Sequence, residues 1–243
     1  MVIKLFLPVC LLALSLCSCT QEYDVTIPFQ DPDHPAPAPI DLVRTTVTME
    51  GTTTNSYDHQ DRIIKTEYND GSSIRYEYSA DHVTGFAYSS AGSLYRVDTY
   101  YYNDKGLAER ITSSTSPGRE EWRTYNDKKQ IVHYSYSDTG FSGDYYYSND
   151  NVDSVVYKKN NVWLYTYIYT YFPNIPNTLD RPNYGKPFLG KESKNPIDTW
   201  KSRSPASLNT IGSNTYAVDE KGRIKTRYQA VHDSLEVFEF TYE

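Results

Sequence analysis

The chain has 243 residues and is acidic, with 24 Lys and Arg residues against 31 Asp and Glu residues and a formal net charge of −7. This balance argues against a nucleic-acid partner, because nucleic-acid binding requires basic patches. The composition includes 25 tyrosines. Tyrosine favours the pleated, half-buried surface of a β-sheet, so the composition favours an all-β protein.

Residues 1–18 have the features of a lipoprotein signal peptide. Lys4 supplies a positive charge, and the apolar run 5–16 that follows is too short to span a bilayer. The sequence Leu-Cys-Ser-Cys at 16–19 matches a bacterial lipobox. We therefore expect cleavage before Cys19 and lipidation of Cys19, which would anchor the protein in the membrane. An ordinary secretory signal without a lipid is the alternative.

The residues after the cleavage site predict the membrane to which the protein is sorted and the tether that joins its anchor to the domain. Thr20 stands where an aspartate would retain a lipoprotein at the inner membrane, so the outer membrane is favoured, with the periplasm and the cell surface both left open. Residues 19–41 contain five prolines between positions 28 and 39 and predict an extended tether. Cys10 and Cys17 leave with the leader, so the mature chain has no cysteine for a disulfide, a nucleophile or a zinc site.

Residues 42–243 are expected to form one domain built from repeats. Tyrosines recur at positions 57, 78, 102, 125 and 147, at intervals of 21, 24, 23 and 22 residues. Tyr102 is followed by the turn sequence Asn-Asp-Lys-Gly at 103–106, and a similar unit begins at Tyr216 with Asp-Glu-Lys-Gly at 219–222. In such a turn Asn or Asp caps its own backbone and Gly adopts a positive φ.

Two strands and two turns in each unit of about 22 residues predict an antiparallel up-and-down meander. We count about 13 to 14 strands, in a curled sheet or a barrel-like arrangement, with the last three at 211–218, 223–230 and 235–242. Segment 162–172 is apolar or aromatic on both faces, which predicts a strand covered on both sides.

Segment 173–210 interrupts this rhythm. Its six prolines argue against a regular ladder, so we expect an irregular excursion with a helical turn near 196–200. Excursions of this length are often functional. The alternative is a plug or cap that covers one end of the sheet.

The turn units resemble the tyrosine–aspartate (YD) repeats of RHS-type shell proteins. The whole segment 42–243 is similar to a family of envelope lipoproteins of unknown function, through the lipobox, the tether, the hairpins, Asn-Ile-Pro-Asn at 174–177 and the last turn unit at 216–223. That resemblance implies a porin-like fold, hence a curled antiparallel meander, and implies no functional residues. Charged residues alternate through the strands, which argues against a membrane-spanning porin with its apolar outer band.

No catalytic motif is recognisable in the sequence. The five histidines are scattered without the spacing of a metal site, and there is no nucleophile elbow or phosphate-binding loop. The aspartates at the turns are explained by backbone capping. We therefore predict no catalytic residue, no metal and no cofactor.

The aromatic residues are the best candidates for binding. A tyrosine at a fixed place in each repeat is mainly expected to stabilise the sheet. The alternative is a face that stacks on a sugar or a protein. The proposed ligand-binding residues are Trp200, Trp163, Tyr165, Tyr167 and Tyr136, with Tyr100, Tyr102, Tyr134, Tyr145 and Tyr147 as further candidates. Trp200, in the excursion, is the first choice.

These observations lead to an envelope lipoprotein that acts as a non-enzymatic binding or assembly module. Its ligand would be a polysaccharide or an envelope protein. Two alternatives remain open at this stage, a glycan-active hydrolase or lyase and a structural subunit of an outer-membrane complex.

Overall fold

A computed structural model describes residues 42–48, 50–179, 186–205, 210–232 and 234–242. The predicted signal peptide, the lipidation site at Cys19 and the proline-rich tether lie outside the described residues. The strands are β1 (Val43–Thr48), β2 (Gly51–Tyr57), β3 (Ile63–Tyr68), β4 (Ser73–Tyr78), β5 (His82–Tyr88), β6 (Leu94–Tyr102), β7 (Ala108–Ser113), β8 (Glu120–Tyr125), β9 (Ile131–Tyr136), β10 (Phe141–Ser148), β11 (Asn151–Lys159), β12 (Val162–Tyr171), β13 (Ile197–Arg203), β14 (Ile211–Val218), β15 (Ile224–Val231) and β16 (Ser234–Tyr242).

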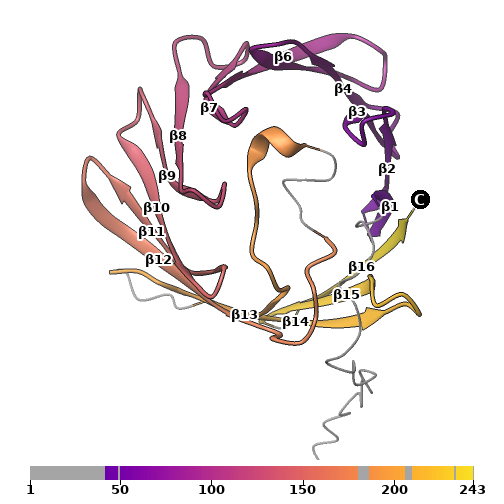
Figure 1. Ribbon diagram of the computed structural model, residues 1–243, viewed down its shortest axis with the longest axis vertical. Coiled ribbons are helices and arrows are strands. Elements are labelled where there is room, and N and C mark those ends of the chain that lie inside the picture. Colours follow the sequence, from indigo (N-terminus) through magenta and orange to yellow (C-terminus); the bar gives the residue numbers. More distant parts are fainter. Residues whose placement is uncertain (1–41, 49, 180–185, 206–209, 233, 243) are drawn as a thin grey trace, which may run out of the picture.

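The described residues form a closed barrel of sixteen antiparallel strands (Figure 1). Each strand pairs with its neighbours in sequence, and β16 pairs with β1 to close the ring. The predicted all-β meander is confirmed. The predicted count of 13 to 14 strands is wrong. One strand that the sequence reading missed is β13, which lies inside the proline-rich segment but between Pro196 and Pro205, so that no proline interrupts its ladder.

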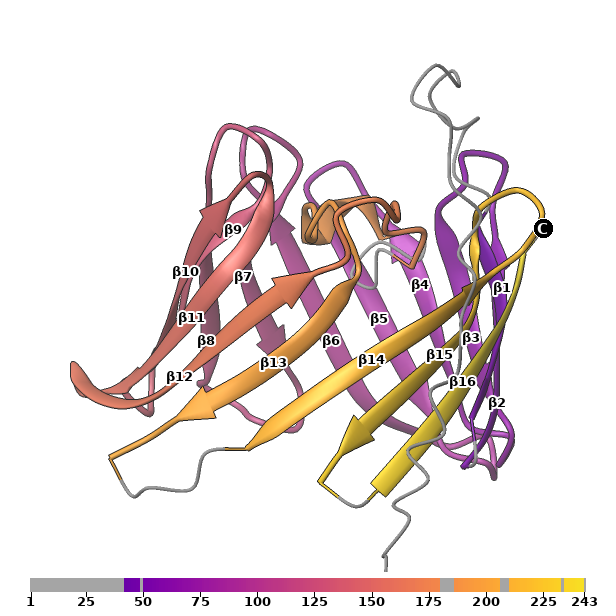
Figure 2. The same cartoon turned by 90° about the horizontal axis from the view of Figure 1, so that it is seen from below.

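The YD-type turns all lie at one end of the barrel. They connect an even-numbered strand to the next odd-numbered one, and an up-and-down barrel places all such connections at the same end (Figure 2). We call this the motif end. In the 103–107 turn, Asn103 Oδ1 accepts hydrogen bonds from the backbone N–H groups of Lys105 and Leu107, at 2.9 and 3.0 Å. Gly106 has a φ of 71°.

The same bonding recurs in the other turns of this type. Asp58, Asn126 and Asp219 each accept two backbone N–H groups, two and four residues further along. The position of positive φ is held by Gly222, by Asp61 or by Lys129. The predicted capping by Asn or Asp is confirmed in these turns, and the positive φ is kept at Asp61 and Lys129 where glycine is lacking.

The repeated tyrosine has a common structural role. In seven of the eight even-numbered strands, a tyrosine near the end of the strand donates its hydroxyl to a backbone carbonyl at the beginning of the preceding strand, at 2.6 to 2.9 Å. The pairs are Tyr57 and Val43, Tyr78 and Ile63, Tyr125 and Ala108, Tyr147 and Ile131, Tyr171 and Val152, Tyr216 and Ile197, and Tyr242 and Ile224. These bonds join neighbouring strands at the motif end.

Removing one of these hydroxyls is expected to lower the stability measurably. Tyr147→Phe deletes only the oxygen that bonds the Ile131 carbonyl, and a net hydrogen bond contributes about 1 kcal/mol. Urea unfolding should show a loss of that size. Tyr95→Phe, at a position that is 55% exposed, serves as the control and should leave the free energy of unfolding unchanged. Equal stabilities for the two variants would contradict a structural role for the repeated tyrosine.

The connection between β12 and β13 enters the barrel (Figure 1). We call its described parts, residues 172–179 and 186–196, the plug. The helical turn expected near 196–200 is wrong, because those residues belong to the start of β13, and a short 3-10 helix, η1, is found instead at Pro187–Leu189. The segment is therefore a plug that packs inside the barrel.

The plug packs against two separate parts of the barrel wall. On one side Phe188, 2% exposed, packs in a cluster with Ile63, Tyr76, Val83 and Ala108 from β3, β4, β5 and β7. On the other side, Ile175 and Leu179 pack in a second cluster whose remaining buried members are Val43, Tyr216, Ile224 and Phe240, from β1, β14, β15 and β16. The hydrophobic core is thus divided between the two ends of the plug.

Hydrogen bonds hold the plug at the motif end. Lys191 N–H donates to the Lys129 carbonyl at 2.8 Å, and Lys194 N–H donates to the Asp150 carbonyl at 3.1 Å. Ile224 N–H donates to Thr178 Oγ1 at 2.8 Å. The plug therefore covers the motif end of the barrel (Figure 2).

The outer face carries charged pairs between strands. Tyr134 and Tyr145 face the interior, so alternation places His133 and Asp144 on the outside. Asp144 accepts from His133 at 2.6 Å and from Lys158 at 2.7 Å. Burial by itself would raise the pKa of Asp144, but these two hydrogen bonds outweigh it and hold the pKa below its usual value.

Among the described residues, no helix is long and apolar enough to cross a membrane.

Candidate functional site

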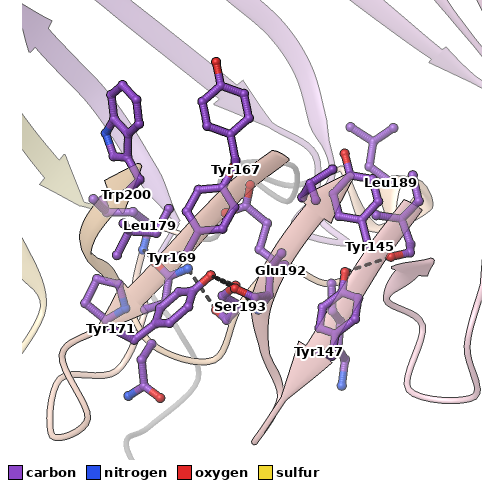
Figure 3. Close-up of a pocket in the computed structure, with 18 of the residues that line it drawn as sticks. Tyr145, Tyr147, Tyr167, Tyr169, Tyr171, Leu179, Leu189, Glu192, Ser193 and Trp200 are labelled. Carbon is purple, nitrogen blue, oxygen red and sulfur yellow. Dashed lines mark hydrogen bonds between the residues drawn. The ribbon is translucent and has the colours of Figure 1, made fainter. Parts of the chain in front are cut away.

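A cavity of about 900 Å³ occupies the part of the lumen that the plug leaves unfilled (Figure 3). Its walls come from strands β8 to β15, and the plug contributes Leu179, Glu192 and Ser193 among others. Tyrosine is the most frequent residue in its lining, and these tyrosines alternate with outward-facing residues along their strands.

Strand β12 shows how the sequence produces this lining. Tyr167, Tyr169 and Tyr171 face the cavity, and the alternation of a β-strand turns Thr166, Ile168 and Thr170 to the outside. The side chains of β12 are half-buried or exposed. The prediction of a strand covered on both sides is therefore wrong. Its inner face is aromatic because it borders a hollow lumen rather than a filled core.

The inner wall carries a continuous row of aromatic rings. We call this the aromatic row. Its successive ring centroids lie 4.6 to 6.4 Å apart. The members, in order around the wall from β9 to β13, are Tyr136, Tyr134, Tyr157, Tyr165, Tyr167 and Trp200. Tyr157 and Tyr165 are stacked, with centroids 4.6 Å apart, and Tyr167 meets Trp200 edge-on at 5.8 Å.

The strand register aligns these rings. Gly143 of β10 lies between Tyr134 of β9 and Tyr157 of β11, and Tyr157 pairs in turn with Tyr165 of β12. One line across four strands therefore carries three rings and one glycine. The row depends on side chains that are distant in sequence but adjacent in register.

Charged groups are placed at the border of the aromatic row. Arg123 Nε donates to Glu121 Oε1 at 2.6 Å, and both side chains line the cavity. Burial by itself would lower the pKa of Arg123, but the neighbouring Glu121 carboxylate outweighs it and raises the pKa. The pair gives one side of the cavity a polar surface.

The plug adds a second polar border. Val152 N–H donates to Ser193 Oγ at 3.0 Å, Ser193 Oγ donates to Tyr171 Oη at 2.9 Å, and Tyr171 Oη donates to the Val152 carbonyl at 2.7 Å. Glu192, the neighbour of Ser193, projects between Tyr169 and Tyr145 (Figure 3). The hydrogen-bonded loop fixes Tyr171 against the plug.

The tyrosine hydroxyls of the cavity are neutral donors. Burial raises the pKa of Tyr171 to about 12, and it also raises the pKa values of Tyr145 and Tyr169. A general base operates best with a pKa near the working pH. These hydroxyls are therefore suited to hydrogen bonding with a ligand rather than to removing a proton at neutral pH. Among the described residues, no group of three His, Cys, Asp or Glu side chains is placed to hold a metal ion.

The structure brings three of the five predicted binding residues to the cavity, namely Trp200, Tyr167 and Tyr136. Trp200 lies on strand β13 and not in an irregular segment. Tyr165 belongs to the aromatic row through its contacts with Tyr157 and Tyr167. Trp163 lies elsewhere. It is 43% exposed and donates its Nε1–H to Thr166 Oγ1 at 3.0 Å, on the outer side of β12.

The further candidates also divide into two groups. Tyr134, Tyr145 and Tyr147 line the cavity, whereas Tyr100 and Tyr102 pack against Phe188 in the filled half of the lumen. The sequence reading missed Tyr157 and Tyr169, although Tyr169 follows Tyr165 and Tyr167 with the same two-residue spacing. It also missed Glu121, Arg123 and Glu192, for which no local signal exists, because only barrel closure and the plug bring them to the site.

Two solved structures share this fold. A porin-like protein from Bacteroides uniformis ATCC 8492 aligns with a TM-score of 0.65 and 19% identity, over 86% of this chain and 99% of that chain. A porin-like protein from Bacteroides vulgatus ATCC 8482 aligns with a TM-score of 0.51 and 14% identity, over 84% of this chain and 99% of that chain. At these identities the likeness establishes the porin-like barrel fold alone. No protein-family model and no curated protein matches the sequence.

Proposed function

We propose that this protein is a non-catalytic binding module of the cell envelope, and that its partly plugged lumen binds a glycan. The aromatic row inside a cavity of about 900 Å³ is the observation that carries the proposal. Pockets that hold small ligands are concave and mostly apolar, with a few polar groups that orient the ligand. The Glu121–Arg123 pair and the tyrosine hydroxyls supply those polar groups here.

A glycan fits this surface better than a wholly apolar ligand. Sugar rings combine a face of C–H groups with equatorial hydroxyls, and tyrosine combines an apolar ring with a hydroxyl that bonds at its edge. The neutral hydroxyl of Tyr169 faces the cavity on the side near the plug and can form such a bond. An acyl chain would bury the Glu121–Arg123 pair and the Tyr169 hydroxyl away from water without offering them a hydrogen bond, which is costly.

The proposed location is the outer membrane, through a lipid on Cys19. The porin-like fold of the structural neighbours is consistent with an envelope protein. Val43 begins β1 at the motif end, so a tether formed by residues 19–41 would join the barrel on the side that the plug covers. The opposite end would then point away from the anchor, and the ligand would enter there.

The test is direct binding by the purified protein to a panel of neutral and acidic oligosaccharides, measured by calorimetry, with product analysis after long incubation. Tyr167→Leu should weaken binding about tenfold, because it removes a ring from the centre of the row. Trp163→Leu is the matched control on the same strand, outside the cavity, and should bind like the wild type.

Three outcomes would contradict the proposal in different ways. New reducing ends or unsaturated sugars would identify a hydrolase or a lyase. Binding that is lost in Trp163→Leu but kept in Tyr167→Leu would place the site on the outer face. An absence of binding across the panel would favour a structural role in an envelope complex.

A further inference from the structure

Two rings of the inner wall lie over glycines. Gly143 on β10 and Gly212 on β14 both face the lumen and are buried, and each is covered by an aromatic ring from the neighbouring strand. Gly143 pairs with Tyr134 of β9, and Gly212 pairs with Trp200 of β13. Neither glycine has the positive φ of a turn residue, so backbone conformation does not explain either of them.

The absence of a side chain at Gly212 determines where the Trp200 ring lies. A Cβ built on Gly212 would stand 2.4 to 2.6 Å from three atoms of the indole, namely Cε2, Nε1 and Cζ2. These distances are far below contact, so any larger residue would displace the ring. The indole therefore occupies the space of the missing side chain and lies across the wall of the barrel instead of projecting into the lumen.

Gly143 has the same relation to Tyr134. A Cβ built on Gly143 would stand 2.5 Å from Cε1 of the tyrosine, 3.1 Å from Cδ1 and 3.2 Å from Cζ. Tyr134 is also in contact with Tyr136 and Tyr157, which meet it edge-on at 5.7 and 6.4 Å. The glycine thus lets the phenol ring cross to the neighbouring strand and join the row.

A third inward-facing glycine provides a comparison within the same barrel. A Cβ on Gly85 of β5 would stand 3.5 Å from the ring of Tyr76, which is an ordinary contact. Tyr76 belongs to the cluster around Phe188, in the filled half of the lumen. The close ring-over-glycine arrangement is thus found at the two glycines beside the cavity and is absent at Gly85.

We propose that Tyr134 over Gly143 and Trp200 over Gly212 are two stacking platforms for pyranose rings, and that the ligand is an oligosaccharide long enough to reach both. The proposal rests on the glycan-binding function proposed above and assigns its two subsites. A ring that lies along the wall offers its π-face to the lumen, and that electron-rich face attracts the C–H groups of a sugar ring.

The spacing of the platforms sets the length of the ligand. Gly143 and Gly212 lie on β10 and β14, four strand intervals apart, which corresponds to about 19 Å along the curved wall. A single sugar is too short to reach both platforms, whereas a chain of several units can do so. Tyr157, Tyr165 and Tyr167 line the wall between them as members of the same aromatic row.

The experiment measures binding of cello-, xylo-, manno- and maltohexaose, with the corresponding monosaccharides, to the full protein. Trp122→Phe and Trp163→Phe are introduced first, so that Trp200 is the single remaining tryptophan and its fluorescence reports the second platform. Gly143→Ala and Gly212→Ala are then compared with Gly85→Ala, the matched control. We expect a hexaose to bind and to change Trp200 emission, and each of the first two variants to weaken binding about tenfold, while Gly85→Ala leaves it unchanged.

Each result decides the proposal. One result would overturn the platforms and leave the glycan-binding function standing. In it, Gly143→Ala and Gly212→Ala bind as tightly as the protein without these substitutions, while Tyr167→Leu still weakens binding. Monosaccharides that bind as tightly as hexaoses would also overturn them. Failure of every sugar to bind would overturn the function itself. If a glycine variant does not fold, as judged by circular dichroism, Tyr134→Leu and Trp200→Leu replace it. Their binding is measured by calorimetry, because Trp200→Leu removes the fluorophore, and unchanged binding in both would refute the proposal.

Discussion

Phe188→Ala is expected to lower the free energy of unfolding by about 3 to 5 kcal/mol, the usual cost of emptying a buried phenylalanine site. Phe188 is 2% exposed, and its ring lies 5.0 Å from the ring of Tyr100 and 6.2 Å from that of Tyr78. It anchors one side of the plug to a wall formed by β3 to β7. Urea unfolding followed by circular dichroism measures the effect.

The matched control for this change is Leu235→Ala, which truncates an apolar side chain that is 57% exposed and should alter stability by no more than about 0.5 kcal/mol. A loss below about 1 kcal/mol in Phe188→Ala would mean that the plug is not part of the cooperative core. In that case the cavity would lack a stable wall on the plug side, and the proposed binding site would have to be revised.

Asn195→Leu is expected to lower the free energy of unfolding by about 3 kcal/mol or more, because it leaves several buried polar groups without hydrogen-bond partners. Asn195 is 7% exposed, and its Nδ2 donates to the carbonyls of Pro173 and Ile175 at 3.1 and 2.8 Å. Its Oδ1 accepts from Asn151 Nδ2 at 3.1 Å. The side chain therefore joins the two described parts of the plug to the first residue of β11.

Thermal and urea unfolding measure this second effect, with Lys194→Ala as the control, because Lys194 is exposed and bonds the barrel through its backbone N–H. Comparable stabilities of Asn195→Leu and Lys194→Ala would show that the network around Asn195 contributes little. Asn195 also lines the cavity, so Asn195→Leu should weaken oligosaccharide binding even under conditions in which the variant remains folded.

The two anchors explain why the lumen is hollow on one side only. Phe188 fills the part of the lumen bordered by β3 to β7, whereas the cavity lies in the part bordered by β8 to β15. The tyrosine-rich composition thus serves two purposes. Tyrosine hydroxyls join strands at the motif end and tyrosine rings line the cavity, and Tyr147, Tyr171 and Tyr216 do both.

Local interactions that can be read from the sequence were sufficient to predict the class of fold. Turn units such as 103–106 and 219–222 determine their own conformation through side chains that bond the backbone two and four residues away. The two-residue period of β-strands then separates the faces. The last strands, β14 to β16, were placed within one residue of their ends for the same reason. Tyr167 and Tyr136 were recognised as binding candidates from their aromatic side chains.

Only the tertiary structure decided which face became the inside, how many strands close the ring and what fills the lumen. Trp163 and Tyr165 are two residues apart, yet an irregular register near Tyr157 and Lys158 separates their environments. Three features depend on contacts between residues that are distant in sequence. They are the β1–β16 pairing, the packing of Phe188 against the wall, and the contact of Trp200 with Gly212. The periodicity of a single strand carries no information about such contacts, because they form only when the whole barrel closes around its plug.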